Sequence, residues 1–136
     1  MKRKALSGLL AVCLGIIGTC FVTITLHQRT AQSVKAITLT QMQKKHENRL
    51  IAQTYARIGY GWTGREWKCL ESLWTAESRF DSAADNPRSS ARGIAQHLGE
   101  TSSDARIQVL RGNYYIFKRY GAPCRAWKWH QRHGWY

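Results

Sequence analysis

Residues 63–80, Thr-Gly-Arg-Glu-Trp-Lys-Cys-Leu-Glu-Ser-Leu-Trp-Thr-Ala-Glu-Ser-Arg-Phe, predict the central helix of a small domain. Thr63 and Glu66 stand three positions apart, the spacing of a capping box at a helix start. The apolar residues that follow have helical spacing: Trp67, Leu70, Leu73 and Trp74. Residues 81–90 are rich in turn formers and include Asn86-Pro87, so we expect the helix to end near Phe80.

The flanking segments also predict helices. A mostly exposed helix is expected from Met42 to about Ile58, and a long one from Ser103 or Asp104 to Gly121. In the long helix one face is apolar, with Ile107, Leu110, Tyr114 and Phe117. Residues 127–136 predict a short aromatic helix or turn. Because no segment shows strand alternation, the fold class is mainly α.

Charge separates the chain into two parts. The 136 residues contain 21 Lys and Arg against 8 Asp and Glu, a net charge of +13 that predicts an anionic partner. Six of the cations precede residue 45, which leaves +7 for residues 45–136, where all six Trp lie. This length excludes a large multidomain enzyme and a dinucleotide-binding domain.

The N-terminus carries the features of a membrane segment. Met1 to Lys4 is cationic, and residues 5–26 contain no charge. As a helix this run would span about 33 Å, close to the ~30 Å hydrocarbon core of a bilayer. We expect residues 1–30 to be an uncleaved signal anchor, or else a signal peptide, with residues 31–60 as a stalk and N-terminal helix. Residues 61–136, the folded domain, are then extracytoplasmic.

Export determines how the cysteines are interpreted. Cys13 and Cys20 lie in the apolar run, which leaves Cys69 and Cys124 in a compartment where disulfides persist. We expect one bridge between them, worth about 4 kcal/mol in the chain-entropy model for a loop of this length. Their spacing does not match a zinc site, and we expect neither a metal nor a cofactor.

Glu77 is the strongest candidate for chemistry. It continues the apolar positions Leu70, Leu73 and Trp74 at the i+7 position, so its carboxyl lies on the apolar stripe of the helix. Burial raises the pKa of a carboxyl, and an acid that titrates near neutral pH suits protonation of a glycosidic oxygen. The alternative is an exposed Glu77, or one paired with Arg79 or Arg92.

The residues around Glu77 resemble a known signature. Glu77-Ser78-Arg79-Phe80, Asp85-Asn86-Pro87 and Gly93-Ile94-Ala95-Gln96 follow one another with the spacing found in soluble lytic transglycosylases. This family is the goose-lysozyme-like branch of the lysozyme superfamily. Residues 119–127 and Gly134-Trp135-Tyr136 are similar to its actinobacterial and phage-borne members, so the resemblance covers residues 61–136.

The resemblance implies a lysozyme-like helical domain that cleaves peptidoglycan between N-acetylmuramic acid and N-acetylglucosamine. Glu77 matches the catalytic acid and base, Gln96 a substrate-contacting residue and Ser78 a hydrogen-bonding neighbour. In the family, the 6-hydroxyl of the muramic acid attacks and leaves a 1,6-anhydro end. Hydrolysis instead requires a second carboxylate, for which Asp81 and Asp85 are the near candidates, although turn formation is their expected role.

The chain departs from this signature in several places. The family's Ala-Tyr-Asn is replaced by Ala126-Trp127-Lys128, so the role of the family's tyrosine does not transfer. Glu71-Ser72 is a second Glu-Ser pair, but it lacks the aromatic and Gly-x-x-Gln that follow Glu77. Trp127, Trp129 and Trp135 either stack on sugar or pack a small core; we predict Trp127 as a substrate contact.

Three other functions stay open at this point. A lysozyme-type hydrolase would cleave the same bond, and a non-catalytic wall-binding protein would keep the same shape. A basic module for single-stranded nucleic acid would match the charge and the Trp residues, but export argues against it. We therefore expect peptidoglycan and, through the N-terminal helix, the membrane as partners, no nucleic acid, and a monomer.

Overall fold

The computed structural model describes the backbone of residues 8–136 and the side chains from residue 28 onward. Helix α1 runs from Gly8 to Tyr60, so the expected stalk is helical throughout. The side chains of residues 1–27 of the expected anchor, including Cys13 and Cys20, lie outside the described residues. Among the residues that are described, no helix is long and apolar enough to cross a membrane.

The chain forms two compact units, Met1–Gln41 and Met42–Tyr136. The second unit begins before residue 61, since it includes the last part of α1. Ala52 and Ala56 of that part are fully buried, and the Asn48 side-chain amide donates to the Phe80 carbonyl oxygen over 2.9 Å. All features described below lie in this second unit.

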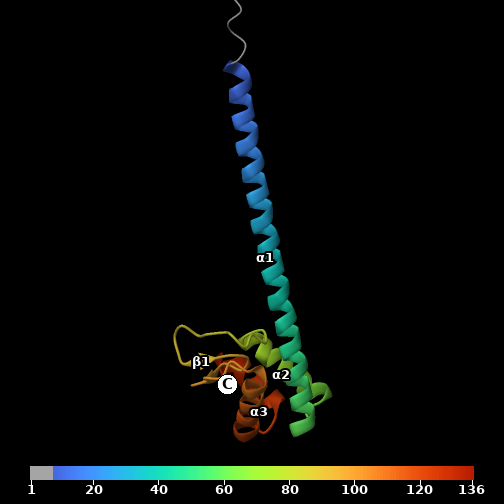
Figure 1. Ribbon diagram of the computed structural model, residues 1–136. Helices are drawn as coiled ribbons and strands as arrows, with labels where there is room; N and C mark the ends of the chain where they lie inside the picture. Colours follow the sequence, from blue (N-terminus) through green and yellow to red (C-terminus); the bar gives the residue numbers. More distant parts are fainter. Residues whose placement is uncertain (1–7) are drawn as a thin grey trace, which may run out of the picture. The chain divides into compact units, whose positions relative to one another are not determined.

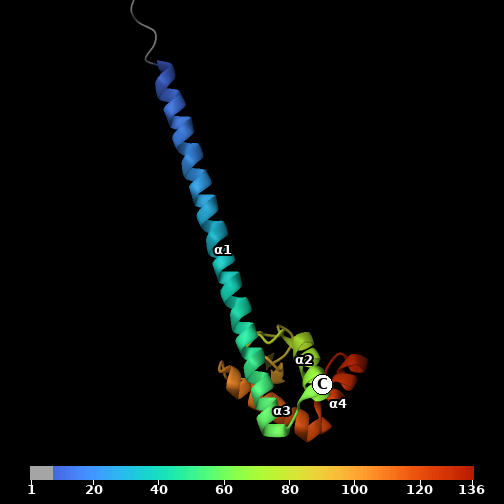
Figure 2. The same ribbon diagram turned by 90° about the vertical axis from the view of Figure 1, so that its right-hand side faces the viewer.

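The second unit is mainly helical, which confirms the predicted fold class (Figures 1 and 2). After α1 come α2 (Gly64–Glu77), α3 (Ala105–Tyr120) and α4 (Pro123–His133). Between α2 and α3 lies an antiparallel hairpin of two short strands, β1 (Ala91–Arg92) and β2 (His97–Leu98). The sequence did not predict these strands because two residues are too few to show alternation.

Helix α2 begins where the sequence predicted, with Thr63 at the N-cap, but without the expected capping box. The Thr63 side chain makes no capping hydrogen bond. The Glu66 carboxylate instead accepts from the backbone N–H of Cys124 over 2.9 Å, at the start of α4. The Cys69–Cys124 disulfide, as predicted, joins the same two helices. The first two turns of α2 therefore hold the start of α4.

Helix α2 ends at Glu77, three residues before the predicted end. The Ser78 N–H still bonds to the carbonyl oxygens of Trp74 and Thr75, and the chain then turns through left-handed conformations at Arg79 and Phe80. This turn buries Phe80 beside Trp74 in the core. The early end leaves Glu77 on the last turn of the helix.

Helix α3 matches its predicted bounds but presents the opposite face to the core. Ile107, Leu110, Tyr114 and Phe117, the predicted apolar face, are 38–58% exposed. The buried residues of this helix are Gln108, Val109, Gly112, Asn113 and Ile116. Gly112 explains the orientation, because a Cβ there would lie 2.7 Å from the Ala95 Cβ and 2.8 Å from the Trp74 ring. The helix thus packs closely through a glycine that periodicity does not detect.

Candidate active site

Glu77 lies at the half-buried end of α2, as its position in the sequence predicted. Leu70, Leu73 and Trp74 on the same side of the helix are fully buried, and the Glu77 side chain is 16% exposed. Burial raises the pKa of the Glu77 carboxyl from 4.5 to about 7. Both protonation states of this carboxyl are therefore populated near neutral pH.

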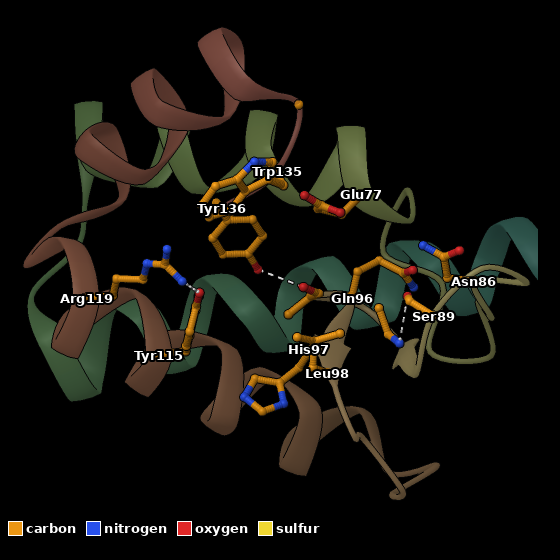
Figure 3. A pocket seen from close by; sticks show the side chains of 13 residues that line it. Glu77, Asn86, Ser89, Gln96, His97, Leu98, Tyr115, Arg119, Trp135 and Tyr136 are labelled. Atoms are coloured by element: carbon orange, nitrogen blue, oxygen red, sulfur yellow. Dashed lines mark hydrogen bonds between the residues drawn. The ribbon is translucent and has the colours of Figure 1, made fainter.

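Glu77 faces a cavity of about 430 Å³ (Figure 3). Of the described residues that line it, Glu77 has the one side-chain carboxyl and Arg119 is the one Lys or Arg. The lining comes from the end of α2, the hairpin with the loop before it, α3 and the C-terminal segment. It consists of Glu77, Asn86, Ser89, Ala91, Ala95, Gln96, His97, Leu98, Tyr115, Arg119, Gly134, Trp135 and Tyr136.

The predicted Gly-x-x-Gln motif is the loop of the hairpin. The strands pair Ala91 with Leu98 and Arg92 with His97, so residues 93–96 form the turn between them. Gly93 has φ +72°, and a Cβ there would lie 2.4 Å from the side chain of Gln108. Glycine is needed at this position because of both its conformation and the close approach of Gln108.

Gln108 fixes the hairpin loop on α3. Its side-chain oxygen accepts from the Ile94 N–H over 2.9 Å, and its side-chain N–H groups donate to the carbonyl oxygens of Ser82 and Ser102. Three loop segments are thus joined by one buried amide. The hairpin loop that lines the cavity is thus held on α3 by the bond from Ile94 to Gln108.

Ser78 and Gln96, the two predicted neighbours of Glu77, both bond to the hairpin loop. The Ser78 hydroxyl donates to the Ile94 carbonyl oxygen over 2.7 Å, which ties the end of α2 to the hairpin loop. The Gln96 amide donates to the Gly93 carbonyl oxygen over 3.0 Å and lines the cavity. No hydrogen bond among the described residues uses its Oε1, so this atom is available to a ligand.

The C-terminal segment lines the cavity beside Glu77, and in the view of Figure 3 Trp135 and Tyr136 lie to the left of this carboxyl. The Tyr136 hydroxyl accepts from Trp74 Nε1 over 2.9 Å and donates to the Ala95 carbonyl oxygen over 2.8 Å. Burial raises the pKa of Tyr136 well above its ordinary value, so the hydroxyl stays neutral. Tyr136 thereby joins α2 to the hairpin loop, while Trp135 lines the cavity.

His130 contacts Glu77, which the sequence did not predict. Its Nε2 lies 3.3 Å from Glu77 Oε1, and the His130 side chain is 17% exposed. Burial lowers the pKa of His130, so a neutral imidazole faces the carboxyl at pH 7. Its Nε2 either accepts the proton of the acid or donates to the carboxylate, depending on the tautomer.

Trp127, predicted as a substrate contact, is not among the cavity-lining residues. Its ring stacks on that of His130, with centroids 5.3 Å apart, and packs against the core. Trp129 stacks on His133 outside the cavity. Of the three Trp residues considered, Trp135 is the one that lines it.

The other acidic candidates have partners elsewhere. Glu71 pairs with Arg49 of α1. Asp81 accepts from the Ala83 N–H, an Asx turn, and pairs with Lys45 over 3.0 Å, while Asp85 pairs with Arg92 over 3.3 Å. The expected turn role of Asp81 is therefore confirmed. Within the described residues no group of three or more His, Cys, Asp or Glu gathers as in a metal site.

Sequence reasoning missed His130, Tyr115, Arg119 and Tyr136 as residues of this site. Tyr115 and Arg119 stand one helical turn apart on α3, but the pattern gave no reason to place this side of the helix against Glu77. The chain matches no protein-family model, no curated protein and no solved structure in the comparisons made. What the site does must therefore be inferred from its geometry and chemistry.

Proposed function

We propose that this protein is a lytic transglycosylase that cleaves the β-1,4 bond between N-acetylmuramic acid and N-acetylglucosamine in peptidoglycan. The observation that carries the proposal is Glu77, a carboxylic acid with a pKa raised to about 7 that faces a cavity. An acid of this strength can donate a proton near neutral pH and accept one in the next step. The order of residues that resembles the transglycosylase signature supports the same assignment.

In the proposed reaction Glu77 acts twice. Its carboxylic acid protonates the glycosidic oxygen as the bond from this oxygen to C1 of the muramic acid breaks. The oxygen of the muramic acid's 6-hydroxyl then bonds to C1, and the hydroxyl proton passes to the Glu77 carboxylate. No water is consumed, and Glu77 ends in its starting protonation state.

Two features of the site support transglycosylation over hydrolysis. Glycoside hydrolysis generally uses a pair of carboxyl groups on either side of the bond. The described cavity lining contains Glu77 as its one side-chain carboxyl, and Asp81 and Asp85 are paired with Lys45 and Arg92 outside it. Intramolecular attack by the 6-hydroxyl requires no second carboxylate.

His130 and Gln96 have supporting roles in this proposal. His130 orients the Glu77 carboxyl through its Nε2, and the Trp127 ring stacked on it limits the imidazole's movement. Gln96 offers its Oε1 to a sugar hydroxyl or amide from the hairpin loop. Trp127 then acts on the reaction through His130 and not through the sugar.

We also propose that the reaction takes place outside the cytoplasmic membrane. Peptidoglycan lies outside the cytoplasmic membrane, and the apolar run of residues 5–26 would carry the domain there as an anchor or a signal. The net charge of +7 on residues 45–136 favours attraction to an anionic wall. We take the protein to act as a monomer on glycan strands.

Cell-wall zymography with the full chain tests the assignment. The wild type should clear the wall, Glu77→Gln should not, and the matched control Glu71→Gln should clear like the wild type. Clearing by Glu77→Gln would refute the role of Glu77, and no clearing by the wild type would favour a wall-binding protein. Mass spectrometry of released muropeptides separates the two reactions, since an anhydro product is one water lighter than a hydrolysis product.

A further inference from the structure

Arg119 brings a positive charge into the cavity that holds Glu77. It lies in the last turn of α3 and, of the described lining residues, is the one Lys or Arg. In Figure 3 Arg119 and Tyr115 lie at one side of the cavity and Asn86 and Ser89 at the other, with Glu77 and Gln96 between them. A ligand that spans the cavity past Glu77 would therefore meet Arg119 on one side.

Aromatic rings hold the Arg119 guanidinium in place. It lies 5.0 Å from the ring centroid of Trp135, 5.5 Å from that of Tyr120 and 5.7 Å from that of Tyr115. Its Nη1 also donates to the Tyr115 hydroxyl. Cation–π contacts of this kind orient a guanidinium without neutralising its charge.

Arg119 has no acidic partner in the part of the chain that the structure describes. None of the ion pairs found there includes this residue. Residues 105–136 contain seven Lys or Arg and no Asp or Glu, so neither α3 nor α4 supplies a carboxylate. A guanidinium has five N–H donors, and the Tyr115 hydroxyl uses one. The remaining donors suit the planar, bidentate recognition of a carboxylate.

We propose that Arg119 binds a carboxylate of the substrate and so makes the site selective for anionic glycan over neutral chitin-like glycan. The inference rests on the proposed function, because it concerns the same cavity. In peptidoglycan two groups have this chemistry. One is the lactyl carboxylate of muramic acid without a peptide, and the other is a free carboxylate of the stem peptide.

Binding measurements on the full chain with Glu77→Gln, which prevents cleavage, test the proposal. Three tetrasaccharides are compared by isothermal titration calorimetry: neutral (GlcNAc)4, alternating GlcNAc-MurNAc with free lactyl carboxylates, and the same glycan with stem peptides. Adding Arg119→Gln should weaken binding of a carboxylate-bearing glycan about tenfold and leave (GlcNAc)4 unchanged within about twofold. Adding Arg125→Gln, an exposed control on α4 outside the cavity, should change neither.

The outcomes identify which carboxylate Arg119 binds, and they separate a failure of the Arg119 role from a failure of the proposed function. A selective loss with the free lactyl glycan assigns the lactyl carboxylate, and a loss confined to the peptide-bearing glycan assigns the stem peptide. An equal loss on neutral and anionic glycans would overturn the role of Arg119 while leaving the proposed function intact. If the parent binds none of the three saccharides, the proposed function fails and this inference fails with it. Arg119→Lys keeps the positive charge but lacks the planar guanidinium, so we expect it to show intermediate selectivity. This variant tests the proposal even if Arg119→Gln folds poorly.

Discussion

Replacing Glu77 by Gln should make the protein more stable at alkaline pH. Gln has nearly the shape of Glu but no ionisable group. The folded chain raises the pKa of the Glu77 carboxyl from 4.5 to about 7 because it withdraws this group from water. Between these values the folded state binds more protons than the unfolded state, so the free energy of unfolding decreases as pH rises.

The size of the effect follows from the difference between the two pKa values. Each pKa unit corresponds to about 1.4 kcal/mol, and the pKa of Glu77 rises from 4.5 to about 7 on folding. The free energy of unfolding of the wild type should therefore be about 3 kcal/mol lower above pH 7 than below pH 4.5. Glu77→Gln has no ionisable group at this position, so it does not lose this stability as pH rises. Its gain over the wild type should therefore be near zero at pH 4 and about 3 kcal/mol at pH 8.

Urea unfolding of both proteins at pH 4, 6 and 8 measures this gain directly. Taking the difference between the proteins cancels titrating groups that do not contact Glu77, including Asp81, whose lowered pKa acts in the opposite direction. Glu71→Gln, on the same helix but paired with Arg49, loses an ion pair and should gain no stability at pH 8. A gain for Glu77→Gln that is absent at pH 8, or equal at pH 4 and pH 8, would refute the burial argument.

Three further predictions concern other parts of the unit. If Glu77 is the general acid, muropeptide release should fall about tenfold per pH unit above pH 7, and a rate that stays flat to pH 9 would contradict this. Asn113 is fully buried and its side-chain amide atoms have no hydrogen-bond partner, so Asn113→Leu should stabilise the fold by about 1–3 kcal/mol; a loss in urea unfolding would contradict it. Replacing Cys69 and Cys124 with Ala should cost about 4 kcal/mol, and the same loss should follow reduction of the wild type; unfolding unchanged by reductant would show that the bridge contributes little.

The sequence predicted those features that depend on neighbouring residues. The start of α2, the bounds of α3 and the buried position of Glu77 each follow from spacing within one helix. The disulfide was predictable because the expected export would leave two cysteines to pair. Gly93-x-x-Gln96 was recognisable as a motif, although its form as a hairpin loop was not, because its hydrogen bonds come from Gln108 on α3.

The apolar periodicity of α3 predicted the wrong face of this helix as the buried one. On α3 the more apolar face is exposed, and the buried face contains a glycine and two amides. Gln108 is buried because it satisfies three backbone groups of the loops around the cavity, and Gly112 because Trp74 and Ala95 leave no room for a side chain there. Neither reason can be read from α3 alone.

The acidity of Glu77 likewise depends on residues far from it in the sequence. The pattern of α2 places the carboxyl at the edge of the apolar stripe, where it could still face water. The C-terminal segment changes this: Tyr136 bonds to Trp74 and Ala95, and His130 of α4 contacts the carboxyl itself. A disulfide and the Glu66 cap hold α4 against α2, so the segment that shields the acid is fastened to the helix that carries it. The first two turns of α2 thus contribute to the raised pKa at its last turn by fixing where α4 begins.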